Sequence, residues 1–396
     1  MLIFTFQMLS MSWTSVSRHV SGTRTKSARS EGVAVLRGGA SDYDRKAYGH
    51  RATFQPGVVK PVGSLYTKML VIAKTKAEDT SWVDENFHNN PQIQHSIYVA
   101  DDPTAALHPP RNKGNEAMIY LTYIIDNYNN LSDVNIFMHS HRFAWHNNII
   151  LDKDAVQMIN RLSAERVQRE GYMNMRCHWD PGCPKWIYPS NLDPDGTKQE
   201  EPIIAVAWSE IFPLDPLPEV LAQPCCAQFA VSRDRILSVP LERYIVYRDW
   251  LLRTPFSDYV SGRVFEYIWQ FMFTGKAIVC AAENVCYCDG YGVCFGNSKN
   301  YREYMVLDGW KKGIQKELES QEQYAKTYEI LVAQGKHDRA AYFGKPSEEK
   351  MTELKETILG ATSWSEDAKK HAMYNGDVAE SRAAEAGRPW KEGDGF

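Results

Sequence analysis

Apolar residues in the middle of the chain follow two kinds of pattern. Short apolar runs at 69–73, 93–99 and 134–139 have the length of buried strands. Between them, the segment 79–85 begins with residues able to cap a helix, and 115–130 carries its apolar side chains on one helical face. This alternation predicts an α/β fold whose mostly parallel sheet has helices on its faces.

The pattern after the third predicted strand is mainly helical. It predicts helices at about 153–171, 203–212, 241–253 and 258–273, and a short strand within 223–233. These elements continue the same α/β domain.

Apolar periodicity is lost at both ends of the chain. Residues 1–66 are rich in Ser, Arg, Gly and Thr, so we expect a mostly disordered, basic leader. Residues 296–396 are charged, polar and low in aliphatic side chains, which is typical of appended helices and disorder. The compact domain is therefore expected to span 67–295.

Composition narrows the classes of partner. Hydrophobic residues make up 43% of the chain and the net charge is only −4, which suits a protein with a substantial core. No basic stripe accompanies the aromatic residues, which argues against nucleic acid as a partner. The sequence has no run of about 18 apolar residues, so it predicts no membrane span. The apolar stretch Met1–Leu9 lacks a basic n-region and makes a poor signal peptide. We expect a small-molecule or glycan substrate, and the oligomeric state stays open.

All eight cysteines lie between positions 177 and 294. The even count and the clustering favour disulfides in the secretory pathway lumen or outside the cell, with buried thiols in the cytoplasm as the alternative. Cys177–Cys183 is the favoured local bridge, because Pro and Gly among the five intervening residues permit a tight loop. A zinc site built from Cys280, Cys286 and Cys288 is a third hypothesis, although the paired Cys-x-x-Cys form is missing.

The third predicted strand ends in a histidine-bearing turn. His139 and His141 are two residues apart, so on a strand both rings would face one side, and Ser140 would point away. Together they are candidates to bind a divalent metal, Mn²⁺ or Zn²⁺, or a substrate diphosphate. His146 offers a third metal ligand and Arg142 a phosphate contact. In the alternative interpretation, backbone carbonyls satisfy the rings around a buried turn.

Three further positions near strand ends are candidates for substrate binding. Asp102 is a candidate to hold a ribose or a base edge, although Asp before Pro is also common turn chemistry. Asn112 and Gly114 would allow a nucleotide to approach the backbone closely, unless they simply form a loop.

Two carboxylates are candidates for activating an acceptor. Glu266 lies in an apolar helix, where burial would raise its pKa and suit it to general base catalysis. An ion pair with Arg263 one turn earlier is the competing structural role. Asp258 is the second candidate, and its alternative role is the N-cap of that helix.

Several uncommon sequence words occur in an order that resembles a known family. They are Trp82, Asp101–Pro103, Asn112–Gly114, Tyr120–Tyr128, His139–His146, Cys225–Phe229 and Ser261–Trp269. Over about residues 69–295 the chain resembles the fungal domain-of-unknown-function 3431 family. It departs from the family pattern at Asn115, where arginine is expected. Because that family is uncharacterised, the resemblance implies little about mechanism.

The chain is more distantly similar to family-2-like glycosyltransferases of the type A, nucleotide-diphospho-sugar transferase fold. These proteins run strand, acidic turn, Asn-x-Gly, helix, and then a strand that ends in metal-binding aspartates. Here Tyr98–Asp102, Asn112–Gly114 and Ile136–His141 occur in the same order. His139 and His141 stand where the aspartates would stand, and imidazole suits Zn²⁺ and softer ions better than Mg²⁺.

The leading hypothesis is a glycosyltransferase-like enzyme that moves a sugar from a nucleotide-sugar donor to an acceptor. A zinc-dependent hydrolase using His139, His141 and His146 is one alternative. A non-catalytic carbohydrate-binding or scaffold protein is the other. Nucleotide binding would favour the first hypothesis, bound Zn²⁺ without nucleotide the second, and neither the third.

Overall fold

The structure, a computed structural model, describes residues 52–193, 196 and 198–396. Most of the predicted leader therefore lies outside the described residues. Its described end contacts the α/β body, because the N–H of Gly57 donates to the carbonyl of Arg169 at 3.0 Å and Tyr66 is buried.

A five-stranded sheet with the order β2-β1-β3-β5-β4 forms the centre of the body. The strands span β1 Lys68–Lys74, β2 Ile93–Val99, β3 Val134–His139, β4 Tyr172–Asn174 and β5 Phe229–Ser232. Strand β1 pairs in parallel with β2 and β3, whereas β5 runs antiparallel to both β3 and β4. The α/β class is confirmed, but the sheet is mixed, since the antiparallel half arises from strands far apart in sequence.

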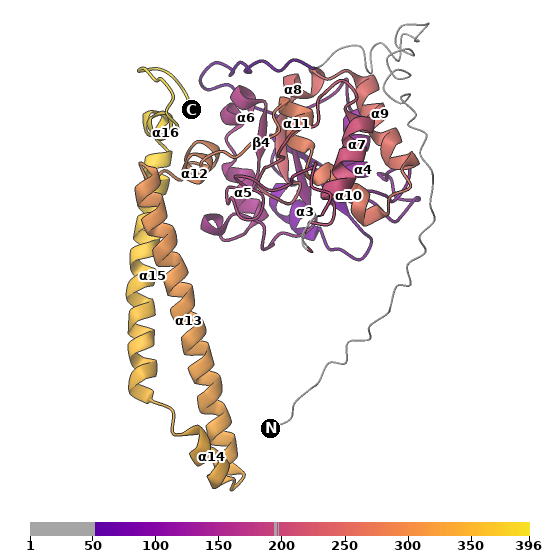
Figure 1. The fold of residues 1–396 in the computed structure, drawn as a ribbon. Coiled ribbons are helices and arrows are strands. Elements are labelled where there is room, and N and C mark those ends of the chain that lie inside the picture. Colours follow the sequence, from indigo (N-terminus) through magenta and orange to yellow (C-terminus); the bar gives the residue numbers. More distant parts are fainter. Residues whose placement is uncertain (1–51, 194–195, 197) are drawn as a thin grey trace, which may run out of the picture. The chain divides into compact units, whose positions relative to one another are not determined.

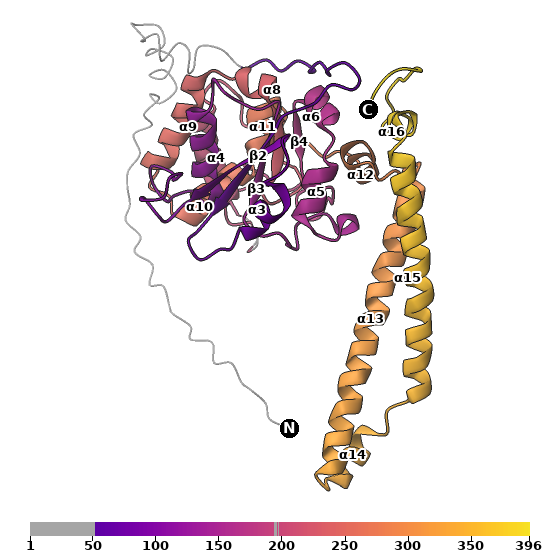
Figure 2. The same ribbon diagram turned by 180° about the vertical axis from the view of Figure 1, so that it is seen from behind.

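Helices cover both faces of this sheet (Figures 1 and 2). The helices of the body are α3 Ser81–Phe87, α4 Glu116–Asp126, the 3₁₀ turn η1 Ile149–Leu151, α5 Ala155–Arg161, α6 Ala164–Glu170, α7 Glu201–Ile211, α8 Arg233–Leu237, α9 Leu241–Arg253, α10 Asp258–Glu266, α11 Trp269–Thr274 and α12 Glu283–Tyr291. Two helices predicted as continuous are broken. The segment 153–171 divides at Leu162–Ser163, where Ser163 caps α6, and the segment 258–273 divides between α10 and α11.

Alternating side chains of the strands divide the core into two layers. Val71 and Phe137 pack into the layer formed with α4, α7, α9 and α11. Their neighbours Leu70 and Ile136 pack into the opposite layer, formed with α3, α5, α6 and α12. The central strands are buried on both faces, which is why they are continuous apolar runs in the sequence.

The C-terminal region is helical, as predicted. Its helices are α13 Ser298–Ala333, α14 His337–Phe343, α15 Glu348–Gly376 and α16 Ala379–Glu385. Helices α13 and α15 run side by side (Figures 1 and 2) and are joined through α14. Among the residues that the structure describes, no helix is both long enough and apolar enough to cross a membrane.

All eight cysteines are paired, which confirms the disulfide prediction in its general form. The pairs are Cys177–Cys286, Cys183–Cys280, Cys225–Cys226 and Cys288–Cys294. The predicted Cys177–Cys183 bridge is wrong, because the fold brings Cys177 against α12, which carries Cys286. The cysteine zinc site is also wrong, since its three members belong to three different disulfides.

Candidate active site at the carboxyl ends of the parallel strands

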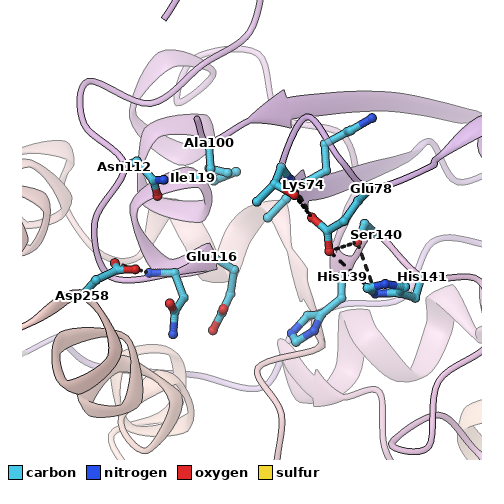
Figure 3. A pocket seen from close by; sticks show the side chains of 13 residues that line it. Lys74, Glu78, Ala100, Asn112, Glu116, Ile119, His139, Ser140, His141 and Asp258 are labelled. Atoms are coloured by element: carbon cyan, nitrogen blue, oxygen red, sulfur yellow. Dashed lines mark hydrogen bonds and ion pairs between the residues drawn. The ribbon is translucent and has the colours of Figure 1, made fainter. Parts of the chain in front are cut away.

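A cleft of about 290 Å³ opens where β1, β2 and β3 end (Figure 3). Its lining comes from all three strand ends, from the start of α4 and from α10, and consists of Ala73, Lys74, Thr75, Glu78, Ala100, Asn112, Asn115, Glu116, Ile119, His139, Ser140, His141 and Asp258. In open α/β sheets, ligands bind outside the carboxyl ends of the strands. The predicted site residues His139, His141, Asn112 and Asp258 therefore meet at one place.

His139 forms the inner wall of the cleft. Its backbone N–H donates to Oε1 of Gln228 at 3.2 Å, while its Nε2 is buried without a hydrogen-bond partner. The ring lies 5.0 Å from the ring of His146, whose Nε2 is likewise buried and unpartnered. Burial is the main cause that lowers the pKa of each imidazole to about 4. His141 lowers the pKa of His139 further, and His139, Arg176 and His141 lower that of His146. Both imidazoles are therefore neutral at pH 7.

Glu78 organises the other rim residues. Ser140 donates through Oγ to Oε1 of Glu78 at 2.7 Å, and Thr75 donates to Oε2 through both its N–H, at 2.6 Å, and its hydroxyl, at 2.9 Å. His141 places Nδ1 3.8 Å from the same carboxylate. Burial alone would raise the pKa of Glu78, but these hydrogen bonds outweigh it and the pKa is lowered. The carboxylate is thus held ionised.

The predicted alternation of His139, Ser140 and His141 is wrong. Strand β3 ends at His139, so the strand geometry does not extend to the next two residues. Ser140 points to Glu78 in the cleft, and the two histidine rings point apart (Figure 3).

Glu116 is the functional candidate that the sequence analysis missed. It is half-buried in the first turn of α4 and lies across the cleft from the residues of β3 (Figure 3). Burial, followed by repulsion from the carboxylates of Glu266 and Asp258, raises the pKa of Glu116 to about 8. The sequence did contain a signal that could have identified Glu116. It is a single carboxyl at the start of an apolar helix, just after an Asn-x-Gly turn.

Asp258 holds the Asn112–Gly114 turn in place. Its Oδ1 accepts the N–H groups of Gly114 and, at 3.2 Å, of Asn115. Gly114 has a φ of +75°, and a Cβ there would come within 2.6 Å of Leu251, so both conformation and space require glycine. Asp258 is not the N-cap of α10, since Ser257 is.

Asp102 and Arg142 lie outside the cleft lining. Oδ1 of Asp102 accepts the hydroxyl of Thr104 at 2.6 Å, and Oδ2 lies 3.1 Å from Nζ of Lys76. The hydrogen bonds from Thr104 come first among the causes that lower the pKa of Asp102 to about 2. Arg142 forms a two-pronged ion pair with Asp154 at 3.0 and 2.9 Å. The contacts of Asp102 match the turn chemistry that was its structural alternative, and Arg142 is paired with Asp154 outside the cleft lining.

Glu266 faces away from the main cleft. Its Oε1 accepts the N–H of Cys226 at 2.9 Å, and it lines a separate cavity of only about 10 Å³. The expected ion pair with Arg263 is replaced, because Arg263 pairs with Glu200. Burial raises the pKa of Glu266 as predicted, but there is no room beside it for a substrate.

The histidines do not form a three-ligand metal site within the part of the chain that the structure describes. His139, His141 and His146 are not among the groups of three or more residues whose ligand atoms lie within 4.8 Å of one another. The one group with that spacing is Cys288, Cys294 and Glu385, and its two cysteines are joined in a disulfide. His139 and His146, whose ring centroids lie 5.0 Å apart, have no third His, Cys, Asp or Glu ligand at that spacing among the described residues.

Comparison with known proteins places this α/β domain in a family. A family model described as "Protein of unknown function (DUF3431)" matches residues 70–289, which is more than half of the chain. The chain belongs to this family, and the region from α13 to α16 lies outside the match. No curated protein and no solved structure matches the chain.

Proposed function

We propose that the cleft is the active site of a glycosyltransferase-like enzyme that moves a sugar from a nucleotide-sugar donor to an acceptor hydroxyl. Two features support the proposal. The chain runs strand, acidic turn, Asn-x-Gly turn, helix and strand in the order typical of type A transferases, with His139 and His141 where those proteins carry metal-binding aspartates. The Asn-x-Gly turn, the start of α4 and the histidine-bearing turn after β3 also border one cleft at the carboxyl edge of the sheet.

The observation that carries the proposal is the carboxyl group of Glu116 facing the cleft with a pKa of about 8. A general base is most effective when its pKa lies near the working pH. Glu116 meets that requirement, whereas Glu78 is held ionised by three hydrogen-bond donors and Asp258 is occupied by the backbone of the Asn112–Gly114 turn.

In the proposed sugar-transfer step, Glu116 accepts the proton that the acceptor hydroxyl loses. The carboxylate of Glu116 takes the proton of the acceptor hydroxyl while that oxygen forms a bond to the anomeric carbon of the donor sugar. The bond between the anomeric carbon and the diphosphate oxygen breaks, and the diphosphate leaves with the electron pair. Lys74 and the exposed ring of His141 lie on the rim, where they would contact the diphosphate.

The volume of the cleft limits how much of a nucleotide-sugar it can enclose. At about 290 Å³ the cleft is at the lower end of the range of about 300–1,000 Å³ for small-molecule sites. It would enclose a single sugar ring, and the nucleotide would extend along the rim past Asn112. The imidazole of His139 is neutral at pH 7, so it would contact the uncharged sugar and not the charged diphosphate.

Thermal unfolding of the full chain tests the proposal. UDP-glucose, UDP-N-acetylglucosamine and GDP-mannose would be added one at a time, each with EDTA, Mn²⁺ or Zn²⁺. At a hundredfold excess over Kd, a ligand of the native state adds about 2.7 kcal/mol of stability, which is readily measured as a higher Tm. We expect at least one nucleotide-sugar to raise Tm in EDTA.

Glu116→Gln separates binding from catalysis. We expect it to keep the Tm increase and to lose about 10²–10⁴-fold in donor turnover, while Glu85→Gln, on the exposed face of α3, keeps both. A Tm increase from Zn²⁺ alone, without any nucleotide effect, would point to the hydrolase instead. Stabilisation by free oligosaccharides, with no effect of any nucleotide-sugar, would point to a non-catalytic carbohydrate-binding protein.

A further inference from the structure

Adjacent residues Cys225 and Cys226 form a disulfide, and the backbone of Cys226 lies near His139, which lines the cleft. Both cysteines are partly exposed, and they precede β5. Cys226 has a φ of +84° and Ala227 a φ of +47°. A residue other than glycine is strained in this left-handed region of backbone conformation, and such strain concentrates at functional sites. The local fold therefore maintains an unfavourable backbone here.

The strained segment lies beside His139. Oε1 of Gln228 accepts the His139 backbone N–H at 3.2 Å, and the backbone of Cys226 lies close enough to the imidazole to raise its pKa. On its other side the same segment is anchored, because the N–H of Cys226 donates to Glu266 at 2.9 Å. Gln228 also donates to Oδ1 of Asn147 at 2.9 Å, which connects the segment to the loop after β3.

Global stability does not explain this disulfide. A disulfide stabilises a protein mainly by restricting the unfolded chain, and the effect grows with the length of the loop that it closes. Cys177–Cys286 and Cys183–Cys280 close loops of 109 and 97 residues, whereas Cys225 and Cys226 are neighbours in the chain. The adjacent pair therefore restricts the unfolded chain least, and its effect is local.

We propose that the Cys225–Cys226 disulfide is a positioning element of the cleft and a redox-sensitive site, which holds His139 in the cleft wall only while it is oxidised. Reduction by a dithiol would break the S–S bond and form two thiols, with two electrons and two protons supplied as the dithiol itself becomes a disulfide. The segment 225–228 would then relax, and the wall at His139 would lose its support. This inference concerns the cleft wall and holds whichever ligand the cleft binds.

Hydrogen–deuterium exchange of the full chain tests the positioning role. In Cys225→Ser/Cys226→Ser we expect amides in 134–147 and 223–232 to exchange about tenfold faster or more, with Tm lower by only a few degrees. The control is Cys288→Ser/Cys294→Ser, which removes another short-range disulfide, here between residues six apart. Its faster exchange should be confined to the surroundings of α12. Unchanged exchange at 134–147 in the Cys225/Cys226 variant, or equal acceleration throughout the chain, would overturn the proposal.

Titration of the wild-type protein with dithiothreitol tests the redox role without a variant. Alkylation and peptide mapping should find Cys225 and Cys226 reduced before the largely buried Cys177, Cys286, Cys288 and Cys294. Over the same range, exchange at 134–147 should accelerate, and reoxidation should restore it. Reduction of the adjacent pair with no change at 134–147 would show that the disulfide does not position His139.

Discussion

The α/β body and the α13–α15 helical pair stabilise themselves by different means. The body buries large aromatic side chains completely, among them Trp269, whose ring packs against Phe273 and Tyr120. In α15 the buried residues are small, namely Ala361, Ser365, Ala372 and Gly376, and Trp310 on α13 stays half exposed. Ion pairs such as Lys350–Glu317, at 2.6 Å, join the two helices.

This contrast explains where ionisable groups with strongly shifted pKa values are found. Within the tightly packed body, a carboxyl or imidazole that faces a cleft loses hydration, so the pKa values of Glu116 and His139 move far from their usual ranges. Most charged side chains on the two long helices remain in water, the buried Asp308 being an exception, and they contribute mainly solubility and weak ion pairs. Perturbed groups in the body are therefore better functional candidates than the more numerous charges of the helical pair.

The largest effect is expected from the long-range disulfide of the body. Cys177→Ser/Cys286→Ser should lower the free energy of unfolding by about 4–5 kcal/mol, because the bridge closes a loop of 109 residues. The double variant Cys288→Ser/Cys294→Ser, with a separation of six, should lose about 2 kcal/mol. Denaturant titration measures both. Equal losses would show that loop length does not determine the contribution of these bridges.

Truncation of tryptophan should separate the two regions nearly as clearly. Trp269→Ala should cost about 3–5 kcal/mol, because it leaves a cavity among fully buried rings. Trp310→Ala removes the same atoms from the helical pair, where half of the side chain is already exposed, and should cost about 1 kcal/mol or less. Comparable losses of unfolding free energy would contradict the proposed difference in packing.

An intermediate, pH-dependent effect is expected at Glu116. Its pKa in the folded protein, about 8, exceeds the ordinary value of 4.5, so the native state binds more protons than the unfolded state between these values. Wild-type stability is therefore reduced as pH rises through this window, and the loss is complete above about pH 8. Glu116→Gln should become the more stable protein by on the order of 2 kcal/mol at pH 9, less than the full shift implies because Glu116 is only half-buried and solvent screens its charge. Glu317→Gln on α13 is the control, and a pH-independent difference for Glu116→Gln would refute the raised pKa.

The smallest effect is expected from the ion pairs of the helical pair. Lys350→Ala and Lys355→Ala, which break contacts of 2.6 and 3.0 Å to Glu317 and Glu322, should each cost less than about 1 kcal/mol. High salt should shrink that cost further. A loss above 2 kcal/mol in thermal or denaturant unfolding would show that these charges are as important as the core of the body.

Local sequence patterns predicted the strands and helices around the site better than the individual residues that line it. The apolar run before His139 marked β3, and the helix at 241–253 has the predicted bounds. His139 and His141 do border the cleft, because a strand end at the edge of a parallel sheet is recognisable from one segment. Glu116 was missed, since its raised pKa depends first on burial by the folded chain and then on Glu266 and Asp258, which lie more than 140 residues further along the chain.

The sequence by itself determined the α/β class, the edge at which polar residues gather, the pairing of the cysteines in general and the helical C-terminal region. These features follow from periodicity, residue type and count, which are local properties. Only the tertiary structure decided the antiparallel half of the sheet, the partner of Cys177 and the separate environments of Glu116 and Glu266. Those depend on which distant segments are packed together, because burial and neighbouring charge, unlike periodicity, are set by contacts between residues far apart in the chain.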